Sequence, residues 1–161
     1  MNQRNWIKSN SFHHSEFEYY PKLIELKRKR KLKISLCIPC LNEERTIGII
    51  LDILVPKLML EYPLLDEVFI IDSGSTDRTE TEVIRRNIPF YRSEEILPHF
   101  GNYAGKGENL WKSIFISKGD IIVWIDADIK NIHPRFNLFQ DIFWPDQLFF
   151  PVRLFSFKHI R

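Results

Sequence analysis

Two aspartates, Asp126 and Asp128, directly follow an apolar run at residues 121–125 that is typical of a strand buried on both faces. Side chains alternate along a strand, so the two carboxylates can point the same way. They would repel each other unless a cation lay between them. Because all the candidate ligands are oxygen atoms, Mg²⁺ or Mn²⁺ bridging to a substrate diphosphate is the natural occupant. Two acids at a strand end are a weak motif, and a strand ending in solvated acids is the alternative.

Other loops carry side chains that suit a nucleotide and its phosphates. Lys106 lies between two glycines ahead of an expected helix, whose free N–H groups and positive end favour anions. The lysine can therefore approach a phosphate closely as a point charge. The segment is not a P-loop, because the spacing and the following Ser or Thr are missing. Asp72, in a strand-end turn, can accept hydrogen bonds from a ribose or a base.

Each of these loops also has a purely structural interpretation. Asn42 could be a helix cap, Gly74 an ordinary turn, and the segment around Lys106 a flexible loop. Their joint occurrence, in this order, favours a nucleotide-sugar site. Such a site would have a cation at Asp128, a lysine near the diphosphate and polar turns around the nucleoside.

Strand-like and helical segments alternate along the chain, which predicts an α/β domain with a mostly parallel sheet, flanking helices and right-handed crossovers. In an open sheet of this kind, ligands bind in the crevice beyond the carboxyl ends of the strands. The loops at 39–44, 72–77 and 126–128 all lie at such ends. Besides the strand before Asp126, strands are expected at residues 33–39, 67–71 and 89–92.

The first two expected helices have local signals at their ends. Pro21 suits the first turn of a helix running to about Arg30. The next helix is expected to begin at residues 42–44 with Asn42 as its cap, and Pro56 is expected to break or kink it. Its apolar positions, at helical spacing, are Ile47, Ile50, Leu51 and Leu54.

Two later helices follow the same logic. Ser75 or Thr76 can cap a helix that continues through Ile84. The last one opens at residues 104–108, and Gly119 is placed to stop it. The apolar face expected for this last helix consists of Leu110, Trp111, Ile114 and Phe115.

Composition sets broad limits. The chain has 161 residues, of which 44% are hydrophobic and 27% charged, so neither disorder nor a fibrous repeat is indicated. The basic run at residues 27–31 is expected to be a solvated approach to the first strand. No second basic patch accompanies it, and no nucleic-acid partner is expected. No apolar stretch is long enough to cross a bilayer and the amino terminus is polar, which favours a cytoplasmic protein.

The two cysteines, Cys37 and Cys40, do not make a disulfide framework. They form a C-x-P-C sequence that superficially copies a thioredoxin-like redox motif, so a redox protein is a rival hypothesis. However, strand alternation places Cys37 inside the first strand, away from a helix N-terminus that would stabilise its thiolate.

Four segments together resemble the GT-A glycosyltransferases of family 2. The resemblance is strongest to the glucosyl-3-phosphoglycerate synthase group, because a GKGExLW element is followed by D-x-D and Asn131-x-His133-Pro134. It covers residues from about 12 to 136, about the amino-terminal half of a usual member. The segments are Pro39-Cys40-Leu41-Asn42-Glu43-Glu44, Asp72-Ser73-Gly74-Ser75-Thr76-Asp77, Gly105-Lys106-Gly107-Glu108-Asn109-Leu110-Trp111 and Asp126-Ala127-Asp128.

The resemblance implies a Rossmann-like fold and transfer of glucose, with retention at the anomeric carbon, from UDP-glucose or a similar donor to 3-phosphoglycerate. Lys106 would lie by the uracil and diphosphate, Asp126 would hold ribose or sugar, and Asp128 would bind Mg²⁺ or Mn²⁺. Pro39, Leu41 and Glu43 would frame the nucleoside, and Ser73 would contact the base. No nucleophile or general base is assigned.

The resemblance also implies that a second half of the family supplies a histidine metal ligand, the phosphoglycerate-binding residues and much of a dimer contact. The chain is accordingly divided into an extension with a short helix (1–32), the nucleotide-sugar-binding domain (33–136) and an atypical aromatic tail (137–161). This chain alone is expected to bind donor weakly and to turn over poorly. The alternatives are a non-catalytic or split remnant, and a family 2 enzyme acting on a lipid phosphate or polysaccharide.

Overall fold

The computed structural model describes residues 19–103, 105–130 and 132, together with the backbone of 154–156. The expectations for residues 1–18, for Asn131 and His133, and for most of the aromatic tail lie outside this part, so the division into three segments stays a prediction. No helix in the described part has both the length and the apolar composition that a membrane span needs.

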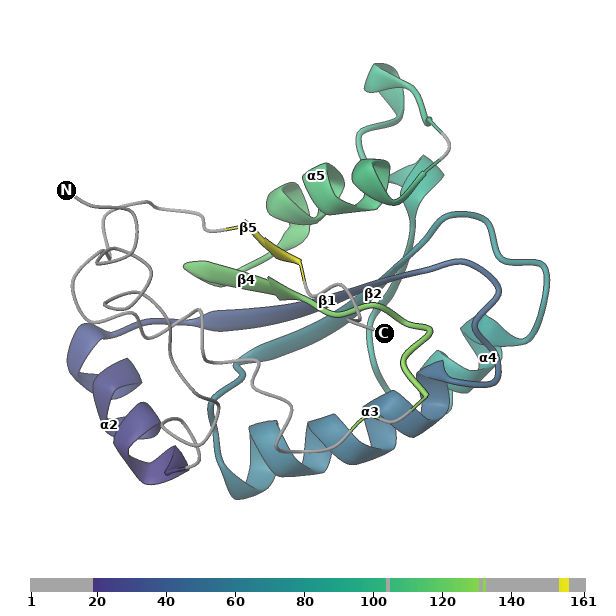
Figure 1. The fold of residues 1–161 in the computed structure, drawn as a ribbon. Helices are drawn as coiled ribbons and strands as arrows, with labels where there is room; N and C mark the ends of the chain where they lie inside the picture. Colours follow the sequence, from purple (N-terminus) through teal and green to yellow (C-terminus); the bar gives the residue numbers. More distant parts are fainter. Residues whose placement is uncertain (1–18, 104, 131, 133–153, 157–161) are drawn as a thin grey trace, which may run out of the picture.

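A parallel five-stranded sheet forms the centre of the molecule (Figure 1). Its order is β3-β2-β1-β4-β5, and every neighbouring pair is parallel, which confirms the predicted α/β class. The chain builds outward from β1 through β2 to β3 and then returns to the other side of β1 with β4. The direction of winding therefore reverses between β1 and β4, where open α/β sheets place their ligands. The strands are β1 (Ile34–Cys40), β2 (Glu67–Asp72), β3 (Phe90–Arg92), β4 (Ile121–Trp124) and β5 (Leu154–Ser156).

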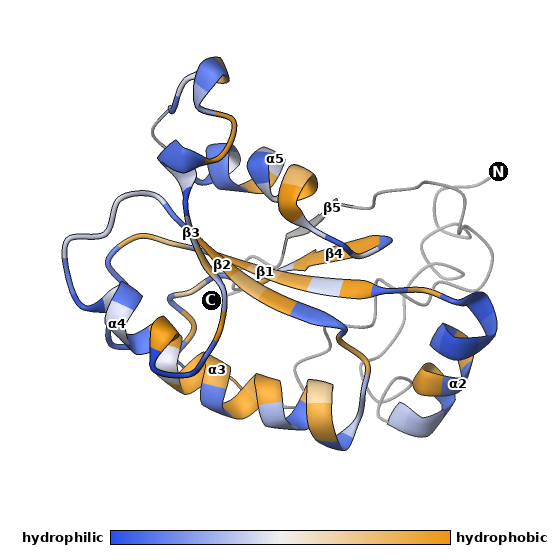
Figure 2. Cartoon of the chain, turned by 180° about the vertical axis from the view of Figure 1, so that it is seen from behind, coloured by the Kyte–Doolittle hydropathy of each residue, from blue (hydrophilic) through white to orange (hydrophobic). Residues whose placement is uncertain are grey.

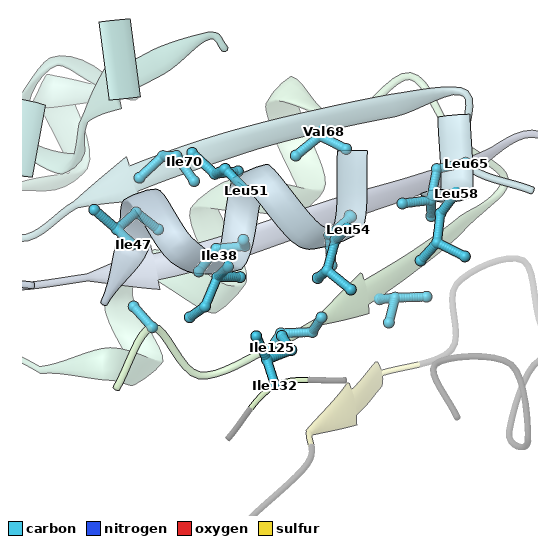
Figure 3. Close-up of a cluster of buried hydrophobic side chains, with 14 of the residues drawn as sticks. Ile38, Ile47, Leu51, Leu54, Leu58, Leu65, Val68, Ile70, Ile125 and Ile132 are labelled. Atoms are coloured by element: carbon cyan, nitrogen blue, oxygen red, sulfur yellow. The ribbon is translucent and has the colours of Figure 1, made fainter. Parts of the chain in front are cut away.

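One face of the sheet is covered by α3 (Ile47–Val55) through an apolar layer (Figures 2 and 3). The four predicted positions Ile47, Ile50, Leu51 and Leu54 are all buried, as expected from their spacing. Each fully buried aliphatic side chain of this kind contributes roughly 1.5–3 kcal/mol. The α-helix ends at Val55, and the chain continues from Pro56 as a π-helix, η2 (Pro56–Glu61), so the predicted break at the proline is confirmed.

On the opposite face lies α5 (Lys106–Ile116), where the predicted apolar face was wrong for Ile114 and Phe115, while Leu110 is half-buried against the core (Figures 1 and 2). Phe115 is 60% exposed and Ile114 38% exposed. The side chains that this helix buries are polar instead: Glu108, Asn109, Lys112 and Ser113. The apolar and polar residues both recur at helical spacing, and the polar set is buried because its members find hydrogen-bond partners in the sheet and loops.

The amino-terminal helix α2 (Tyr20–Arg30) matches its prediction, with Pro21 in its first turn. The basic run that follows in its last turn is not wholly solvated. Lys27 is buried, and its ammonium lies 2.7 Å from the carboxylate of Asp66 and donates to the carbonyl of Pro63 at 3.1 Å. This lysine therefore fastens α2 to the loop before β2.

Two predicted helix caps were wrong. Asn42 adopts a positive φ of 57°, and α3 begins only at Ile47 without a side-chain cap. At the start of α4 (Thr79–Ile84), neither Ser75 nor Thr76 caps the helix. The carboxylate of Asp77 instead accepts from the backbone N–H of Thr79 at 2.9 Å.

Gly119 does not stop α5, which has already ended at Ile116. A Cβ at Gly119 would lie 2.6 Å from Ser35 Oγ and 2.8 Å from the Ser35 backbone nitrogen. This glycine is therefore required by the close approach of the incoming chain to β1.

Candidate functional site

A cavity of about 310 Å³ opens at the carboxyl ends of β1 and β4, at the point where the winding reverses. Parallel pairing explains its location, because Cys37 of β1 is in register with Trp124 of β4 and Cys40 is in register with Asp72 of β2. The loops that follow these strands therefore leave the sheet side by side. The lining residues are Pro39, Cys40, Leu41, Glu43, Ser73, Gly105, Lys106, Asn109, Asp126, Ala127 and Asp128.

The cavity brings together nearly all of the site residues expected from the sequence. Pro39, Leu41 and Glu43 come from the loop after β1, and Leu41 is 52% exposed, so it offers apolar surface at the rim. Ser73, Lys106, Asp126 and Asp128 come from three other segments.

Lys106 and Asp126 face each other across the cavity wall as an ion pair. Lys106 is the first residue of α5, and Gly105 before it has a φ of 130°, a conformation open to glycine but strained for other residues. The lysine thus stands where the helix presents its positive end, and its charge offsets that of one carboxylate. A diphosphate in the cavity would meet this cation directly.

The oxygen ligands of the cavity fit a hard divalent cation. Asp126 and Asp128 both line it, and Asp128 is exposed. Within the described part of the chain, no three His, Cys, Asp or Glu side chains gather closely enough to hold a metal by themselves. Mg²⁺ and similar ions commonly take one or two carboxylates and complete their shell with substrate phosphates and water. The residues therefore suit a metal that binds together with a phosphorylated ligand.

The loop after β1 is fastened to the loop after β2 by reciprocal hydrogen bonds. The backbone N–H of Asn42 donates to Ser75 Oγ at 2.8 Å, and the Asn42 side-chain oxygen accepts from the N–H of Thr76 at 2.8 Å. The N–H of Glu43 donates to Thr79 Oγ1 at 2.8 Å. Asn42 therefore joins two walls of the cavity instead of starting a helix.

A second pair of bonds completes this junction. The N–H of Glu44 donates to Asp77 Oδ2 at 3.1 Å, and the N–H of Arg78 donates to Glu44 Oε2 at 3.1 Å. Although burial opposes it, hydrogen bonds from Thr79 and Glu44 hold the pKa of Asp77 below its ordinary value. The pKa of Glu44 is lowered by its hydrogen bonds from Arg78. Both acids are thus kept ionised as acceptors for the loops.

Asp72, expected to accept from a ribose or base, has its carboxylate buried and is absent from the described lining of the cavity. Its Oδ2 accepts from the N–H groups of Gly74 and Ser75 at 2.9 and 2.7 Å. Its Oδ1 accepts from the hydroxyl of Ser75 and from the Cys40 thiol. The acid therefore shapes the turn that presents Ser73, and it acts on the site through that turn.

Asn109 lines the cavity but was not among the expected site residues. It is 1% exposed, and its amide nitrogen donates to the Ile71 carbonyl at 2.9 Å and to Ser73 Oγ at 2.8 Å. The signal was available in the sequence, because Asn109 follows Lys106 by three residues and so lies on the same side of the helix.

The geometry does not support the rival redox hypothesis. Both Cys37 and Cys40 are buried and free. Burial raises the pKa of each thiol far above its ordinary value, and the neighbouring Asp72 raises that of Cys40 further. A catalytic cysteine needs the opposite shift.

Residues 35–133 match the family model described as glycosyl transferase family 2. The chain belongs to this family. It is also 53% identical over 130 residues to a glucosyl-3-phosphoglycerate synthase of Petrotoga mobilis, a match covering 81% of this chain and 40% of that relative. The resemblance to the synthase group is thereby confirmed, and the chain spans less than half the length of this relative.

The solved structures that share the fold of this family 2 chain include the following two. One is glucosyl-3-phosphoglycerate synthase from Mycobacterium tuberculosis in complex with Mn²⁺ and UDP-glucose, 38% identical with a TM-score of 0.64, covering 71% of this chain and 39% of that one. The other is mannosyl-3-phosphoglycerate synthase from Rubrobacter xylanophilus, which is 27% identical with a TM-score of 0.77. This match covers 82% of the present chain and 42% of the Rubrobacter chain.

Proposed function

We propose that this chain forms the donor site of a metal-dependent glycosyltransferase that takes glucose from UDP-glucose. The observation that supports this most strongly is the single cavity shared by the Ser73 turn, Lys106 and the two aspartates Asp126 and Asp128. Together with the loop after β1, these segments, far apart in the sequence, supply surface for a nucleoside, a cation for phosphate and carboxylates for a metal, and a nucleotide sugar needs all of these at once.

The resemblance to the synthase group gives several lining residues a role in this proposal. Pro39 and Leu41 give apolar surface for the nucleoside, with Glu43 beside them, and the Ser73 hydroxyl contacts the base. The ammonium of Lys106 reaches the uracil and the diphosphate. Asp126, held by Lys106 in the structure, accepts hydrogen bonds from ribose or sugar hydroxyls when the lysine turns toward phosphate.

Asp128, with Asp126 beside it, would hold Mg²⁺ or Mn²⁺ together with the diphosphate oxygens. The bound cation would supply Lewis-acid stabilisation of the departing diphosphate. The positive end of α5 and Lys106 add to the same electrostatic effect without a proton transfer. No side chain in the described part is assigned as nucleophile or general base.

The acceptor proposed for the whole protein is 3-phosphoglycerate, with retention at the anomeric carbon. This rests on the matched synthase, of which the chain covers 40%. The parts of that relative beyond the match would complete the acceptor site, and pairing of two copies is a further expectation for the whole protein.

The decisive test is Mn²⁺-dependent binding of UDP, measured by titration calorimetry on the wild-type chain and on Asp128→Asn. The substitution removes a metal ligand at an exposed position, so the fold should persist while the Mn²⁺-dependent gain in UDP affinity, expected to be about tenfold or more, disappears. Glu94→Gln, an exposed acid on the short helix after β3, is the control and should bind like wild type.

Unchanged Mn²⁺-dependent UDP binding in Asp128→Asn would contradict the proposed metal site. Thermal shifts with Mn²⁺ and UDP-glucose, GDP-mannose or GDP-glucose then identify the donor, because a ligand that binds only the folded state raises the melting temperature. UDP-glucose should give the largest shift.

A further inference from the structure

The ion pair between Lys106 and Asp126 joins a side chain that can move to one that is held in place. Asp126 comes directly after Ile125, whose backbone N–H donates to the Cys37 carbonyl at 3.3 Å at the end of the sheet. The Asp126 side chain is 21% exposed, whereas that of Lys106 is 42% exposed. The lysine also lies between two glycines, and the described part of the chain places no atom of another segment within 4 Å of a Cβ on either of them. Lys106 is therefore the member of the pair that is free to change its position.

This pairing weakens the attraction of the cavity for a divalent cation. Asp126 and Asp128 both line the cavity, and the ammonium of Lys106 offsets the charge of one of them. The ammonium contacts Oδ1 of Asp126, which leaves Oδ2 for another ligand. However, a positive charge a few ångströms away repels a cation at either oxygen, because Coulomb repulsion does not depend on which oxygen is used. A metal alone must therefore bind against the charge of the lysine.

A diphosphate would change this balance. Lys106 is the first residue of α5, so the lysine extends from the positive end of the helix, where anions are favoured. A diphosphate carries more negative charge than one carboxylate, so it would attract the ammonium more strongly than Asp126 does. Movement of the ammonium to phosphate would restore the full charge of Asp126 and remove the repulsion of the metal.

We propose that Lys106 competes with the metal for Asp126, so that a divalent cation binds poorly by itself and binds well once a diphosphate has drawn the lysine away. This rests on the proposed function, in which one cavity holds a nucleotide diphosphate and a metal. It adds a coupling through the lysine to any direct bond between metal and phosphate. Because linkage is reciprocal, the nucleotide and the metal strengthen each other's binding by the same factor. A site of this kind retains its metal only together with its substrate.

The test measures the Kd of Mn²⁺, with and without saturating UDP, from the electron paramagnetic resonance signal of the free ion. Wild type is compared with Lys106→Met, which keeps the length of the side chain and removes its charge. Without UDP, Lys106→Met is expected to bind Mn²⁺ about tenfold more tightly than wild type. The factor by which UDP tightens Mn²⁺ binding should fall by a similar amount, because only the direct contribution of the phosphates remains.

Two matched variants separate the ion pair from other effects of charge. Lys130→Met removes an exposed lysine two positions beyond Asp128 and should change the Kd of Mn²⁺ by less than about threefold. Lys106→Arg keeps a cation at the same place and should bind Mn²⁺ alone as weakly as wild type. Lys106 is exposed at the start of α5, so these variants should fold, and circular dichroism checks that they do.

Each outcome decides between the alternatives. Without UDP, a Kd of Mn²⁺ for Lys106→Met within about threefold of wild type would overturn the competition. Equal gains in Lys106→Met and in either Lys130→Met or Lys106→Arg would also overturn it, because the effect would not depend on the charge in the pair. Tighter Mn²⁺ binding with an unchanged effect of UDP would show that the diphosphate does not release the lysine. In all these cases, Mn²⁺-dependent UDP binding by wild type would leave the proposed function standing, and its absence would count against that function instead.

Discussion

The helices on the two faces of the sheet bury different kinds of side chain against it. On the α3 side, the buried layer is made of aliphatic side chains that contact one another without directional bonds (Figure 3). On the α5 side, the buried helix residues are Glu108, Asn109, Lys112 and Ser113, and each has a bonded partner. Apolar packing is non-directional and tolerates small shifts, whereas hydrogen bonds fix a position. The face that must hold Ser73 and Lys106 in place is the one that uses hydrogen bonds.

Lys112 is the centre of the polar face. It is fully buried, and its ammonium donates to the Ser93 carbonyl at 2.7 Å and the Gly101 carbonyl at 3.2 Å. It also lies 2.8 Å from a carboxylate oxygen of Glu108. A buried charge is tolerated only when it is paired and hydrogen-bonded in this way. One lysine thus ties α5 to the loops that precede it.

The largest effect is expected from Lys112→Met, which keeps the length of the side chain and removes the charge. Each of the two carbonyls left without a donor costs about 1–3 kcal/mol, so we expect a loss of roughly 3–5 kcal/mol in the free energy of unfolding. Urea denaturation measures it. Lys118→Met, at a lysine whose side chain is 83% exposed, is the matched control and should change stability by no more than about 0.5 kcal/mol. Equal losses in both variants would show that the polar face is not specially dependent on this lysine.

A somewhat smaller loss is expected on the apolar face from Leu54→Ala. Leu54 is fully buried against the sheet, and truncating such a leucine lowers the free energy of unfolding by about 2–5 kcal/mol. Neighbouring side chains can partly fill the space that the leucine leaves, so we expect a value in the lower half of that range. Ile49→Ala, on the same helix but 53% exposed, should cost less than about 1 kcal/mol. UDP binding by folded Leu54→Ala should stay near wild type. A specific loss of UDP binding would show that the apolar face also positions the site.

The smallest of these effects concerns pH. Hydrogen bonds from Lys112 and Trp111 hold the pKa of Glu108 below the ordinary value of 4.5. Because the folded pKa is depressed, this group contributes stability above about pH 4.5, and the contribution is lost as the pH falls through the folded pKa. Glu108→Gln should therefore show a shallower fall in unfolding free energy between pH 5 and pH 3 than wild type.

Urea titrations across that range check the expectation. Glu94→Gln, which removes an exposed acid, should follow the wild-type pH dependence. A wild-type slope in Glu108→Gln would mean that other carboxylates with lowered pKa values, such as Asp52 beside Arg86, account for the acid dependence.

Much of the fold follows from local patterns in the chain. The apolar runs of β1 and β4 predict buried strands, and the spacing of Ile47, Ile50, Leu51 and Leu54 predicts the buried side of α3, because aliphatic residues have no alternative to burial. The end of the α-helix at Pro56 is equally local.

For α5 the same rule failed for Ile114 and Phe115. Its sequence offers an apolar stripe and a polar stripe, and only the partners supplied by the sheet decide which is buried, such as the Ile71 carbonyl for Asn109 and the Trp124 indole N–H for Ser113. The caps at Asn42 and Ser75 failed for a related reason, because each side chain finds a better partner in the other's loop.

The sequence by itself determined the α/β class, the order of the elements and the set of loops that gather at the carboxyl ends of the strands, since these depend on periodicity and turn residues along the chain. Only the tertiary structure decided that Asp72 shapes its turn, that Asn42 bridges two walls and that Asn109 donates a hydrogen bond to Ser73. The contacts of Asn42 and Asn109 join residues 33 to 38 positions apart. The bonds of Asp72 within its own turn are local in the sequence, but its carboxylate is buried only because the turn packs beside Cys40, whose thiol also donates to it. Hydrogen bonds are directional, so the partner to which each of these side chains bonds is determined only once the chain has folded.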